Sequence, residues 1–588
     1  MSQNDPETLT YHAMLVIWGQ FGHSLGLIDP LQSVVLHQKT VQHSPQAKVL
    51  EFLVAILAGL EHMQDISRSA HPLDQDRAVA KAWGQAGWAD YSGVSRTLAG
   101  LTQAEAEQIT NVLDQITRPI LAEEVMRALQ SSGRLSYDGD LTDRPVSNTS
   151  TTYPGVAYGH MGDGLQLDYQ SAMVSMHSPT YGRLWLSVEQ HPGDTVSCTE
   201  AEAMVRAAEA KTGLRPWRRT DLLGQRIRAL ESECQKCQLK VRVCQEALEK
   251  ARASLMESQQ KWQKGREVFL QLEADYQERK RRERPYSALA KVRQWLCMLE
   301  RRQGRQEKKI TALEKHLHHR QQQVLDHQAE IQRLRTRLEH FEAENRTNAY
   351  PIQADFRLDA GFGSRENIAF LIEMGYETYT KPYSDWLTPR LKKRVGPLTQ
   401  WMRVGDNAEM VNWQAERFPD FPYPIDVALE RFSTGKTQRH STLLHFGSDP
   451  LAANLLAWFH HYNARQTIEA GIKEGKNVFT MHHLKVRSAP AIFLQEQFAV
   501  FAANFVRWSA RWLSEQCPQI PSGWQDTTHP NVKELVKVAA HTSAWVDWQD
   551  QGCLLMFTDH SLFAGRSLTL KKQWVVQLPL PFSENAHF

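Results

Sequence analysis

The sequence has few cysteines, no long apolar run and almost no net charge. Seven cysteines in 588 residues is an odd number, and most lie in segments with helical spacing, so no disulfide framework is indicated. No apolar run approaches the ~18 residues that a membrane-spanning helix needs. The first twenty residues lack a basic stretch followed by an apolar stretch and a cleavage site. These absences predict a cytoplasmic protein with reduced thiols and no membrane partner.

The overall charge does not identify a partner. The chain has 68 basic and 66 acidic residues, and a net charge of +2 can hide regions of opposite sign. Hydrophobic residues make up 41% of the chain, which is ordinary for a globular protein. At this length more than one domain is expected.

The N-terminal region, residues 1–130, has the spacing of short amphipathic helices. Between residues 74 and 102 a helical segment, a turn with Gly84 and Gly87, and a second helix follow one another. This order is typical of a helix-turn-helix, which would place the start of the second helix against DNA. The candidate contacts are Ser92, Ser95 and Arg96. The alternative is a small helical bundle with an ordinary turn.

Residues 131–200 change to the pattern of strands. Three runs rich in aromatic and aliphatic residues, at 133–144, 165–177 and 182–194, are bounded by Gly, Pro or Asp. After residue 350 the order strand, glycine turn, helix, strand is expected. Short strand-like runs follow between residues 384 and 450, and two further helices are expected before the C-terminal strands.

Two heptad seams occupy residues 218–346. Apolar residues recur at 3-4 spacing from Ile227 to Tyr276 and again from Val292 to Phe341, with Pro285 at the break. The pattern predicts an antiparallel coiled-coil hairpin, and fifty to sixty residues per helix give an arm of roughly 75–90 Å. Cys234 and Cys237 form a CxxC pair, but both fall on seam positions and no second pair follows, so core packing is favoured over a metal site.

Five polar side chains share one face of a predicted helix that follows residue 454. They stand at intervals of three, four or seven residues, which places them on one side of a helix: Tyr462, Arg465, Glu469, Lys473 and Lys476. An exposed stripe of ion pairs is the simple interpretation, worth only ~0.3–0.5 kcal/mol per pair.

Isolated carboxylates at two strand ends favour a different interpretation. Asp140, with Asp138 as a rival, ends an apolar run before a polar turn, and Asp359 ends another before a glycine-containing turn. Three carboxylates that hold two divalent cations form a site for phosphodiester hydrolysis and transfer. Mg²⁺ suits such oxygen ligands, and DNA phosphates would then be partners for Arg465 and the two lysines.

The same residues resemble a known family. Tyr462, Arg465, Glu469 and Lys476 match the YREK signature of DDE transposases from bacterial insertion sequences of the IS-four-like superfamily. "DLT" at residues 140–142 and "DAGF" at residues 359–362 resemble the two aspartate motifs of that family. Asp140 is preferred over Asp138 because it fits the D-x-T pattern.

The resemblance implies a fold and an activity. The fold would be α/β, with an RNase H-like core formed by a mixed sheet and flanking helices, interrupted by the coiled-coil hairpin and preceded by a helical domain. Asp140, Asp359 and Glu469 would be the catalytic triad with two Mg²⁺ ions, for which Mn²⁺ can substitute. The enzyme would be an endonuclease and strand transferase that moves DNA by cut and paste, often through hairpin ends. An inactive, transposase-derived DNA-binding protein is the alternative.

The family also implies partners and a place in the cell. The transposon ends and target DNA, both double-stranded, would be the substrates of a homodimer in the bacterial cytoplasm, associated with the nucleoid. Tyr462, Arg465, Lys473 and Lys476 would hold the DNA backbone. In relatives a tryptophan between the second Asp and the Glu stacks on a flipped base, and Trp386, Trp401 and Trp413 lie there, although packing in the core is the simpler role.

The expected domains follow from these motifs. They are an N-terminal helical DNA-binding domain (1–130), three parts of the catalytic core (131–217, 347–383 and 451–520), the coiled-coil insertion (218–346), a small strand-rich insertion (384–450) and a C-terminal region (521–588). The hairpin stands at an unusual place for the family. We expect it to project from the catalytic core and to serve dimerisation or binding of the end DNA. Basic residues near its tip favour a DNA backbone contact there, and a solvated turn is the alternative.

Overall fold

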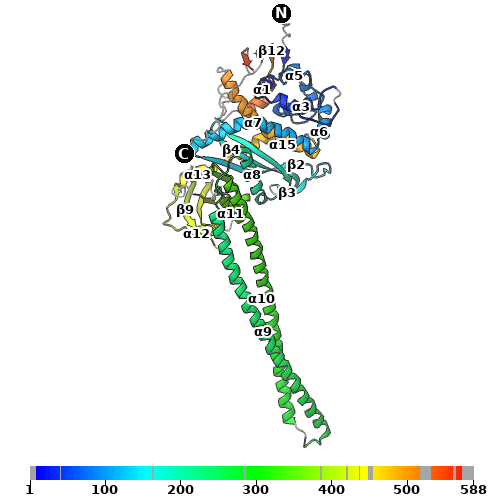
Figure 1. Cartoon of the computed structure of the whole chain (residues 1–588), viewed down its shortest axis with the longest axis vertical. Coiled ribbons are helices and arrows are strands. Elements are labelled where there is room, and N and C mark those ends of the chain that lie inside the picture. Colours follow the sequence, from blue (N-terminus) through cyan, green and yellow to red (C-terminus); the bar gives the residue numbers. More distant parts are fainter. Residues whose placement is uncertain are drawn as a thin grey trace. The chain divides into compact units, whose positions relative to one another are not determined.

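The computed structural model describes residues 8–39, 42–161, 164–283, 286–384, 387–418, 421–435, 437–447, 454–516, 531–560 and 565–571. The chain divides into two compact units (Figure 1). The first contains the residues up to Trp217 and those from Ala349 onward, and the second contains Arg218–Asn348.

The first unit contains most of the helices. They are α1 Ala13–Ser24, α2 Ile28–Gln32, α3 Pro45–Leu57, α4 Asp65–Arg68, α5 Arg77–Ala82, α6 Tyr91–Ala99, α7 Gln103–Ser132, α8 Ala201–Thr212, α11 Arg365–Glu373, α12 Thr388–Arg394, α13 Leu455–Asn463, α14 Gln466–Asn477, α15 Ala489–Gln516 and α17 Val532–Lys537, with 3-10 turns η1 Leu73–Gln75, η2 Ser197–Thr199, η3 Ala360–Phe362 and η5 Ala539–His541. Among the described helices none is long and apolar enough to cross a membrane.

The strands of the first unit form two sheets. They are β1 Thr8–Thr10, β2 Arg134–Pro145, β3 Ala157–Met161, β4 Gly164–Ser178, β5 Gly182–Pro192, β6 Gln353–Leu358, β7 Glu377–Thr380, β8 Met402–Arg403, β9 Ala408–Glu416, β10 Ile425–Thr434, β11 Thr437–Phe446, β12 Ala544–Gln549, β13 Gly552–Phe557 and β14 Ser567–Lys571.

The larger sheet is mixed, as expected. Its order in the described part of the chain is β3-β4-β2-β6-β7-β11-β10-β9-β8, and β5 also pairs with β4. β2 is antiparallel to β4, and β4 to β5, whereas β2, β6 and β7 run parallel. The three strands predicted before residue 200 are confirmed as β2, β4 and β5, while β3 is an additional strand.

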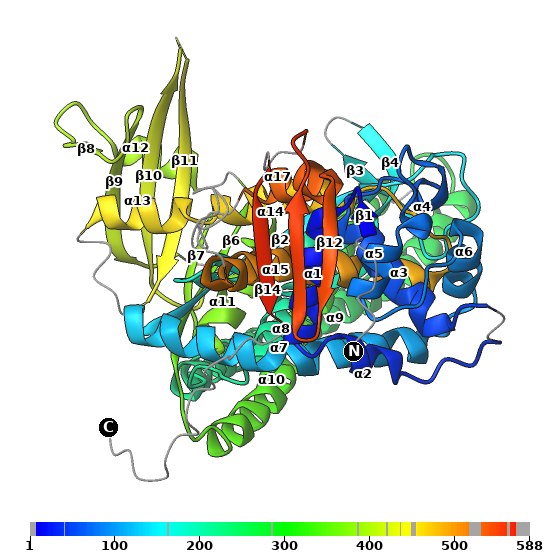
Figure 2. The ribbon, with the colours of Figure 1, turned by 90° about the horizontal axis from the view of Figure 1, so that it is seen from above.

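The predicted strand-rich insertion extends this same sheet. β11 pairs with β7, and β10, β9 and β8 follow it in antiparallel order. α13 crosses the extension (Figure 2), and its Trp458 is fully buried against residues that include Tyr379 and Met410. The segment that leads from the second aspartate to α14 is therefore built onto the central sheet.

Helices cover both faces of the central strands. Side chains on a strand point alternately to its two faces, so Gly139 and Arg144 of β2 face opposite ways. Met204 of α8 lies against Gly139, where a β-carbon would collide with it. On the other face Arg144 pairs with Glu496 of α15, and both side chains are fully buried. This second face also carries Asp138 and Asp140.

The N-terminal and C-terminal segments share one core. β1 pairs with β12, so a four-stranded sheet of order β1-β12-β13-β14 joins both ends of the described chain. The same apolar cluster contains Trp18 of α1, Phe52 of α3, Phe505 of α15 and Leu555 of β13. The N-terminal helices are thereby packed onto α15, which in turn lies on the central sheet.

A buried carboxyl in α3 predicts a pH dependence of stability. Glu51 is fully buried, its Oε2 accepts a hydrogen bond of 2.9 Å from the Ala89 N–H, and burial raises its pKa to about 9. The folded state keeps this proton between pH 4.5 and 9 whereas the unfolded chain releases it, so this group makes stability fall as pH rises through that range.

The substitution Glu51→Gln is therefore expected to stabilise the protein at pH 8 by about 1–2 kcal/mol and to flatten this part of the pH dependence. Urea unfolding between pH 5 and 9 measures the effect, and Glu107→Gln, at an exposed position of α7, is the control. Parallel pH profiles for the wild type and Glu51→Gln would contradict the assignment.

The second unit is a long helical hairpin, as predicted. α9 Thr220–Glu278 and α10 Tyr286–Arg346 lie side by side along their length (Figure 1). Arg226 pairs with Glu330 at 3.1 Å and Arg252 with Glu314 at 2.6 Å, so the helices are antiparallel. Cys234 and Cys237 are buried, as expected for seam residues. Pro285, the predicted break, lies outside the described residues.

Candidate functional site

The three predicted carboxylates come from three elements that meet at the centre of the sheet. Asp140 lies in β2, Asp359 directly follows β6, and Glu469 lies in the first turn of α14. β2 and β6 are parallel neighbours, and Gly139 stands opposite Leu358. Asp140 and Asp359 each follow one residue later, so the register itself makes the two carboxylates neighbours.

The helix that carries Glu469 differs from the expected one. A single helix with all five polar residues on one face was predicted, but α13 ends at Asn463 and α14 begins at Gln466, with a two-residue turn between them. Tyr462 therefore lies on α13, Arg465 directly precedes α14 without a side-chain capping bond, and only the three later residues share a helix. The break reflects packing: α13 crosses the sheet extension, whereas α14 lies against β2.

Buried contacts fix α14 against the sheet. Arg183 of β5 donates a hydrogen bond to the carbonyl of Thr467, and a β-carbon at Gly471 would overlap its guanidinium. On the following turn Glu474 pairs with Arg507 of α15 at 2.8 Å. These contacts hold the apolar face of α14 inward and turn Glu469 toward β2.

Arg465 lies between two of the three carboxylates. Its Nη2 is 2.6 Å from Oε1 of Glu469, and its Nη1 is 3.5 Å from Oδ2 of Asp140. Burial raises the pKa of Asp140 to about 7, the charges of Asp359 and then Glu469 add to the rise, and the Arg465 guanidinium opposes it. One guanidinium thus partly neutralises a cluster of acids that repel one another.

Asp359 has an oxygen that the protein does not use. Burial raises the pKa of this carboxyl, while Arg465 and the N–H groups of Gly361 and Phe362 hold it down. Its Oδ1 is buried and accepts no hydrogen bond from the described residues. A buried carboxylate oxygen without a donor is costly in a folded protein and is a ready ligand for a cation.

Asp138, the rival first acid, has a structural partner. Arg357 of β6 donates to Asp138 through Nε at 2.6 Å and Nη2 at 2.8 Å, and both side chains are buried. The third donor of Arg357, Nη1, holds the carbonyl of His461 in α13 at 2.9 Å. The sequence analysis missed Arg357, although its position two residues before Asp359 places it on the same face of β6.

The other residues of this motif that were predicted to contact DNA differ in how exposed they are to solvent. Tyr462 is 5% exposed, and its hydroxyl faces the carbonyl of Leu358 at 3.4 Å. Lys476 donates to Asp143 of β2 at 3.2 Å, and Lys473 is exposed. A DNA contact by each of these residues stays a prediction.

The N-terminal candidates lie away from these acids in the chain. α5 and α6 are joined by residues 83–90, a longer connection than the three or four residues of a helix-turn-helix. Ser92 donates to Asp90, the N-cap of α6, at 2.6 Å, whereas Ser95 and Arg96 are exposed. DNA binding by this helix stays a prediction.

Two of the tryptophans predicted to stack on a base make cation–π contacts with arginines. The guanidinium of Arg431 lies 4.0 Å from the ring centre of Trp401, and that of Arg394 lies 4.8 Å from the ring centre of Trp413. Trp386 lies outside the described residues. Base stacking by these tryptophans stays a prediction.

The residues at this centre have the chemistry of a divalent-metal site. Asp140, Asp359 and Glu469 supply carboxylate oxygens, which Mg²⁺ prefers, and Oδ1 of Asp359 is already bare. Within the described chain no three acidic, imidazole or thiol side chains are close enough together to hold a metal ion as they stand. At this centre Arg465 lies between Asp140 and Glu469. The donor set fits the ion, and the guanidinium supplies its positive charge in this arrangement.

A groove opens beside the acids. It encloses about 850 Å³ and is lined by residues that include Leu141 and Asp143 of β2, Tyr158, Gly361 and Tyr383. Leu141 directly follows Asp140 in the chain, and Gly361 lies two residues after Asp359. Tyr158 and Tyr383 are more than half exposed. Asp140, Asp359, Arg465 and Glu469 are not among the residues that line the groove, so it neighbours the acids only through adjacent residues of the chain.

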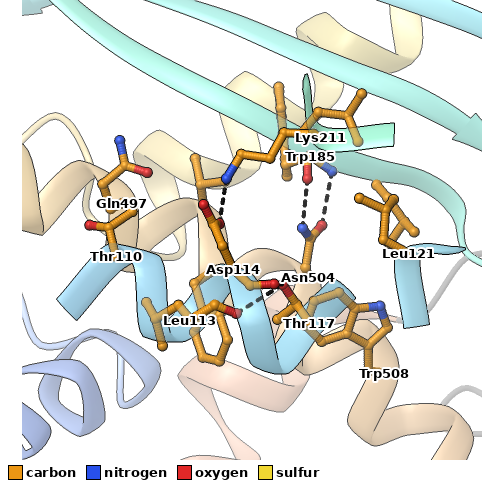
Figure 3. A pocket seen from close by; sticks show the side chains of 14 residues that line it. Thr110, Leu113, Asp114, Thr117, Leu121, Trp185, Lys211, Gln497, Asn504 and Trp508 are labelled. Atoms are coloured by element: carbon orange, nitrogen blue, oxygen red, sulfur yellow. Dashed lines mark hydrogen bonds and ion pairs between the residues drawn. The ribbon is translucent and has the colours of Figure 1, made fainter. Parts of the chain in front are cut away.

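A second cavity is closed by its own polar groups (Figure 3). It measures about 60 Å³, and it lies between α7, β5 and α15. Asn504 bonds both to the N–H of Trp185 at 2.9 Å and to its carbonyl at 2.8 Å, and Lys211 pairs with Asp114. These groups satisfy one another, whereas the buried Nε1 of Trp508, which also lines the cavity, has no hydrogen-bond partner among the described residues.

The chain matches none of the protein-family models and none of the curated proteins with which it was compared. The function therefore has to be inferred from the geometry of the site.

Proposed function

We propose that this protein is a DDE transposase that cuts DNA at the ends of an insertion sequence and joins those ends to target DNA. One observation carries the proposal: Asp140, Asp359 and Glu469, far apart in the sequence, converge at the centre of one sheet around Arg465. The spacing of Tyr462, Arg465, Glu469 and Lys476 supports the same family.

The sheet supports an RNase H-like identity for the core. Its five central strands lie in the order β5-β4-β2-β6-β7, with the first three antiparallel and the last two parallel to β2. The first acid lies on the central strand, the second follows its parallel neighbour, and the third comes from a helix packed on that face. In an RNase H-like nuclease the carboxylates hold the same places.

The side chains divide the work at the site. Asp140, Asp359 and Glu469 would hold two Mg²⁺ ions, which supply an activated water or 3′-OH and stabilise the leaving oxygen. Arg465 has the fork geometry that suits a phosphate, and it holds the scissile strand beside the acids. Lys473 and Lys476, one and two turns beyond Glu469, extend this positive edge along α14. The Asp138–Arg357 pair keeps β2 and β6 in register beneath them.

The substrate and assembly follow from this chemistry. Paired cutting at two ends of an element requires two active sites, so a homodimer on double-stranded transposon ends and target DNA is the working form. The bacterial cytoplasm, at the nucleoid, is the place where such DNA is available.

The test uses the full-length protein and DNA that carries the inverted repeats flanking its own reading frame. We expect strand cleavage at the repeats with Mg²⁺ or Mn²⁺, and none with a chelator, read on a denaturing gel. Tight binding of the repeats without cleavage in either metal would contradict the proposal and indicate an inactive, transposase-derived DNA-binding protein.

A further inference from the structure

Positive charge is concentrated in one part of the hairpin. Residues 279–309 contain twelve basic and three acidic residues, a net charge of 12 − 3 = +9, although the whole chain carries only +2. The facing stretch of α9, residues 248–278, contains five basic and six acidic residues. The charge is therefore not a general property of the arm.

The two halves of the hairpin differ in whether their basic residues form ion pairs. In the half near the helix ends at Thr220 and Arg346, basic residues pair across the helices, as Arg226 does with Glu330 at 3.1 Å and Arg335 with Glu231 at 2.5 Å. Toward the tip, α10 keeps cations that form no ion pair within the described residues.

These cations form one stripe on the outer face of α10. The stripe consists of Lys291, Arg301, Arg305, Lys308 and Lys315, all exposed. Their spacing by sums of three and four places them on the side opposite the buried seam residues Leu296 and Leu299. Twenty-four residues of helix span about 36 Å, which is close to one turn of duplex DNA.

Two of the three acids between Lys291 and Lys315 are turned away from the stripe. Glu300 accepts a hydrogen bond from Trp262 at 3.1 Å, and Glu314 pairs with Arg252 at 2.6 Å, so both face α9.

Leu296 and Leu299 are buried in the seam, and the exposed Trp295 and Met298 do not make the continuous apolar face that a membrane-surface helix needs. Met298 is the exposed large apolar side chain on the same face, and a row of cations around one such side chain fits a polyanion backbone better than an apolar surface.

We infer that this outer stripe of α10 binds the phosphate backbone of duplex DNA, as a second contact separate from the catalytic centre. The inference rests on the proposed function, which makes DNA the partner at hand. Contacts of this kind carry no sequence information, so the stripe would hold DNA of any sequence and add affinity to the specific contacts elsewhere.

The test compares two variants of the full-length protein. In one, all five stripe residues are replaced by Gln; in the control, five exposed cations of α9 are replaced by Gln, namely Lys236, Lys240, Arg242, Lys250 and Lys261. Gln preserves helix propensity, and both variants lose the same charge. Circular dichroism checks that both keep the helix content of the wild type.

The readout is the salt dependence of binding to a 40-base-pair duplex of arbitrary sequence. Each lost phosphate contact lowers the slope of log K against log salt by about 0.9, so loss of all five contacts should lower the slope of the stripe variant by about 4–5 units, and that of the control by less than about 1. Equal slopes for the two variants would overturn the inference.

The result is independent of catalysis. If the wild type fails to cleave its own ends but the stripe variant still loses the salt slope, the transposase proposal fails and the DNA-binding arm stands. If cleavage occurs and the two variants share one slope, the arm inference fails and the transposase proposal stands.

Discussion

Replacing Asp359 by Asn, or Glu469 by Gln, is expected to reduce metal-dependent strand cleavage at the element ends by about 10³-fold or more. Each change removes a charged ligand but keeps the size of the side chain. Asp359 contributes a bare, buried oxygen, and Glu469 lies at the exposed edge of the site, where its side chain is 46% exposed. Neither residue is required to fill the core, so the loss should appear in cleavage and not in folding.

Asp406→Asn is the matched control, because that carboxylate is fully exposed before β9 and far from the site in the chain. Its cleavage rate should equal that of the wild type. Binding of the inverted repeats should persist in the Asp359 and Glu469 variants, measured by gel shift. Cleavage within about threefold of wild type in either variant would rule out the assigned triad.

The second large effect separates Asp138 from Asp140. Asp138→Asn leaves the Arg357 guanidinium buried without its counter-charge, and breaking a buried pair of this kind costs about 3–5 kcal/mol of unfolding free energy. Asp140→Asn should instead raise the free energy of unfolding. The pKa of Asp140 is raised from 3.8 to about 7, so as pH rises this carboxyl ionises first in the unfolded chain. The free energy of unfolding therefore falls as pH rises through this range, and the substitution removes that loss.

Urea unfolding at pH 8 without metal measures both effects. Asp140→Asn is expected to gain about 1–2 kcal/mol because it removes the penalty of a buried carboxylate among acids. In the same assay Asp138→Asn should lose stability even though its side chain lies only two residues away on the same strand. Loss of equal size in both variants would mean that Asp140 is also a structural acid.

Much of this architecture follows from local patterns. The heptad spacing fixes the hairpin because apolar residues at 3-4 intervals allow only one buried face. The alternating runs around Asp140 and Asp359 locate β2 and β6, and the carboxyl ends of parallel strands bring the two acids together. Glu469 was predicted from its spacing to Tyr462 and Arg465, a feature of the chain alone.

Other features depend on contacts between distant residues. The break between α13 and α14 arises because Trp458 packs on the sheet extension while Ile468 packs in the other core. The pairing of β11 with β7 and the Arg357–Asp138 pair likewise join segments far apart in the sequence. Local spacing contains no record of such partners, and the position of Arg465 between two acids is visible only once α14 is docked.

The most direct test of the central claim is metal binding itself. Isothermal titration of the DNA-free protein with Mn²⁺ should give saturable binding in the wild type and in Asp406→Asn. In Asp359→Asn and Glu469→Gln the binding should weaken at least tenfold, because each has lost a charged ligand. Equal Mn²⁺ affinity in all four proteins would contradict a metal site formed by Asp140, Asp359 and Glu469.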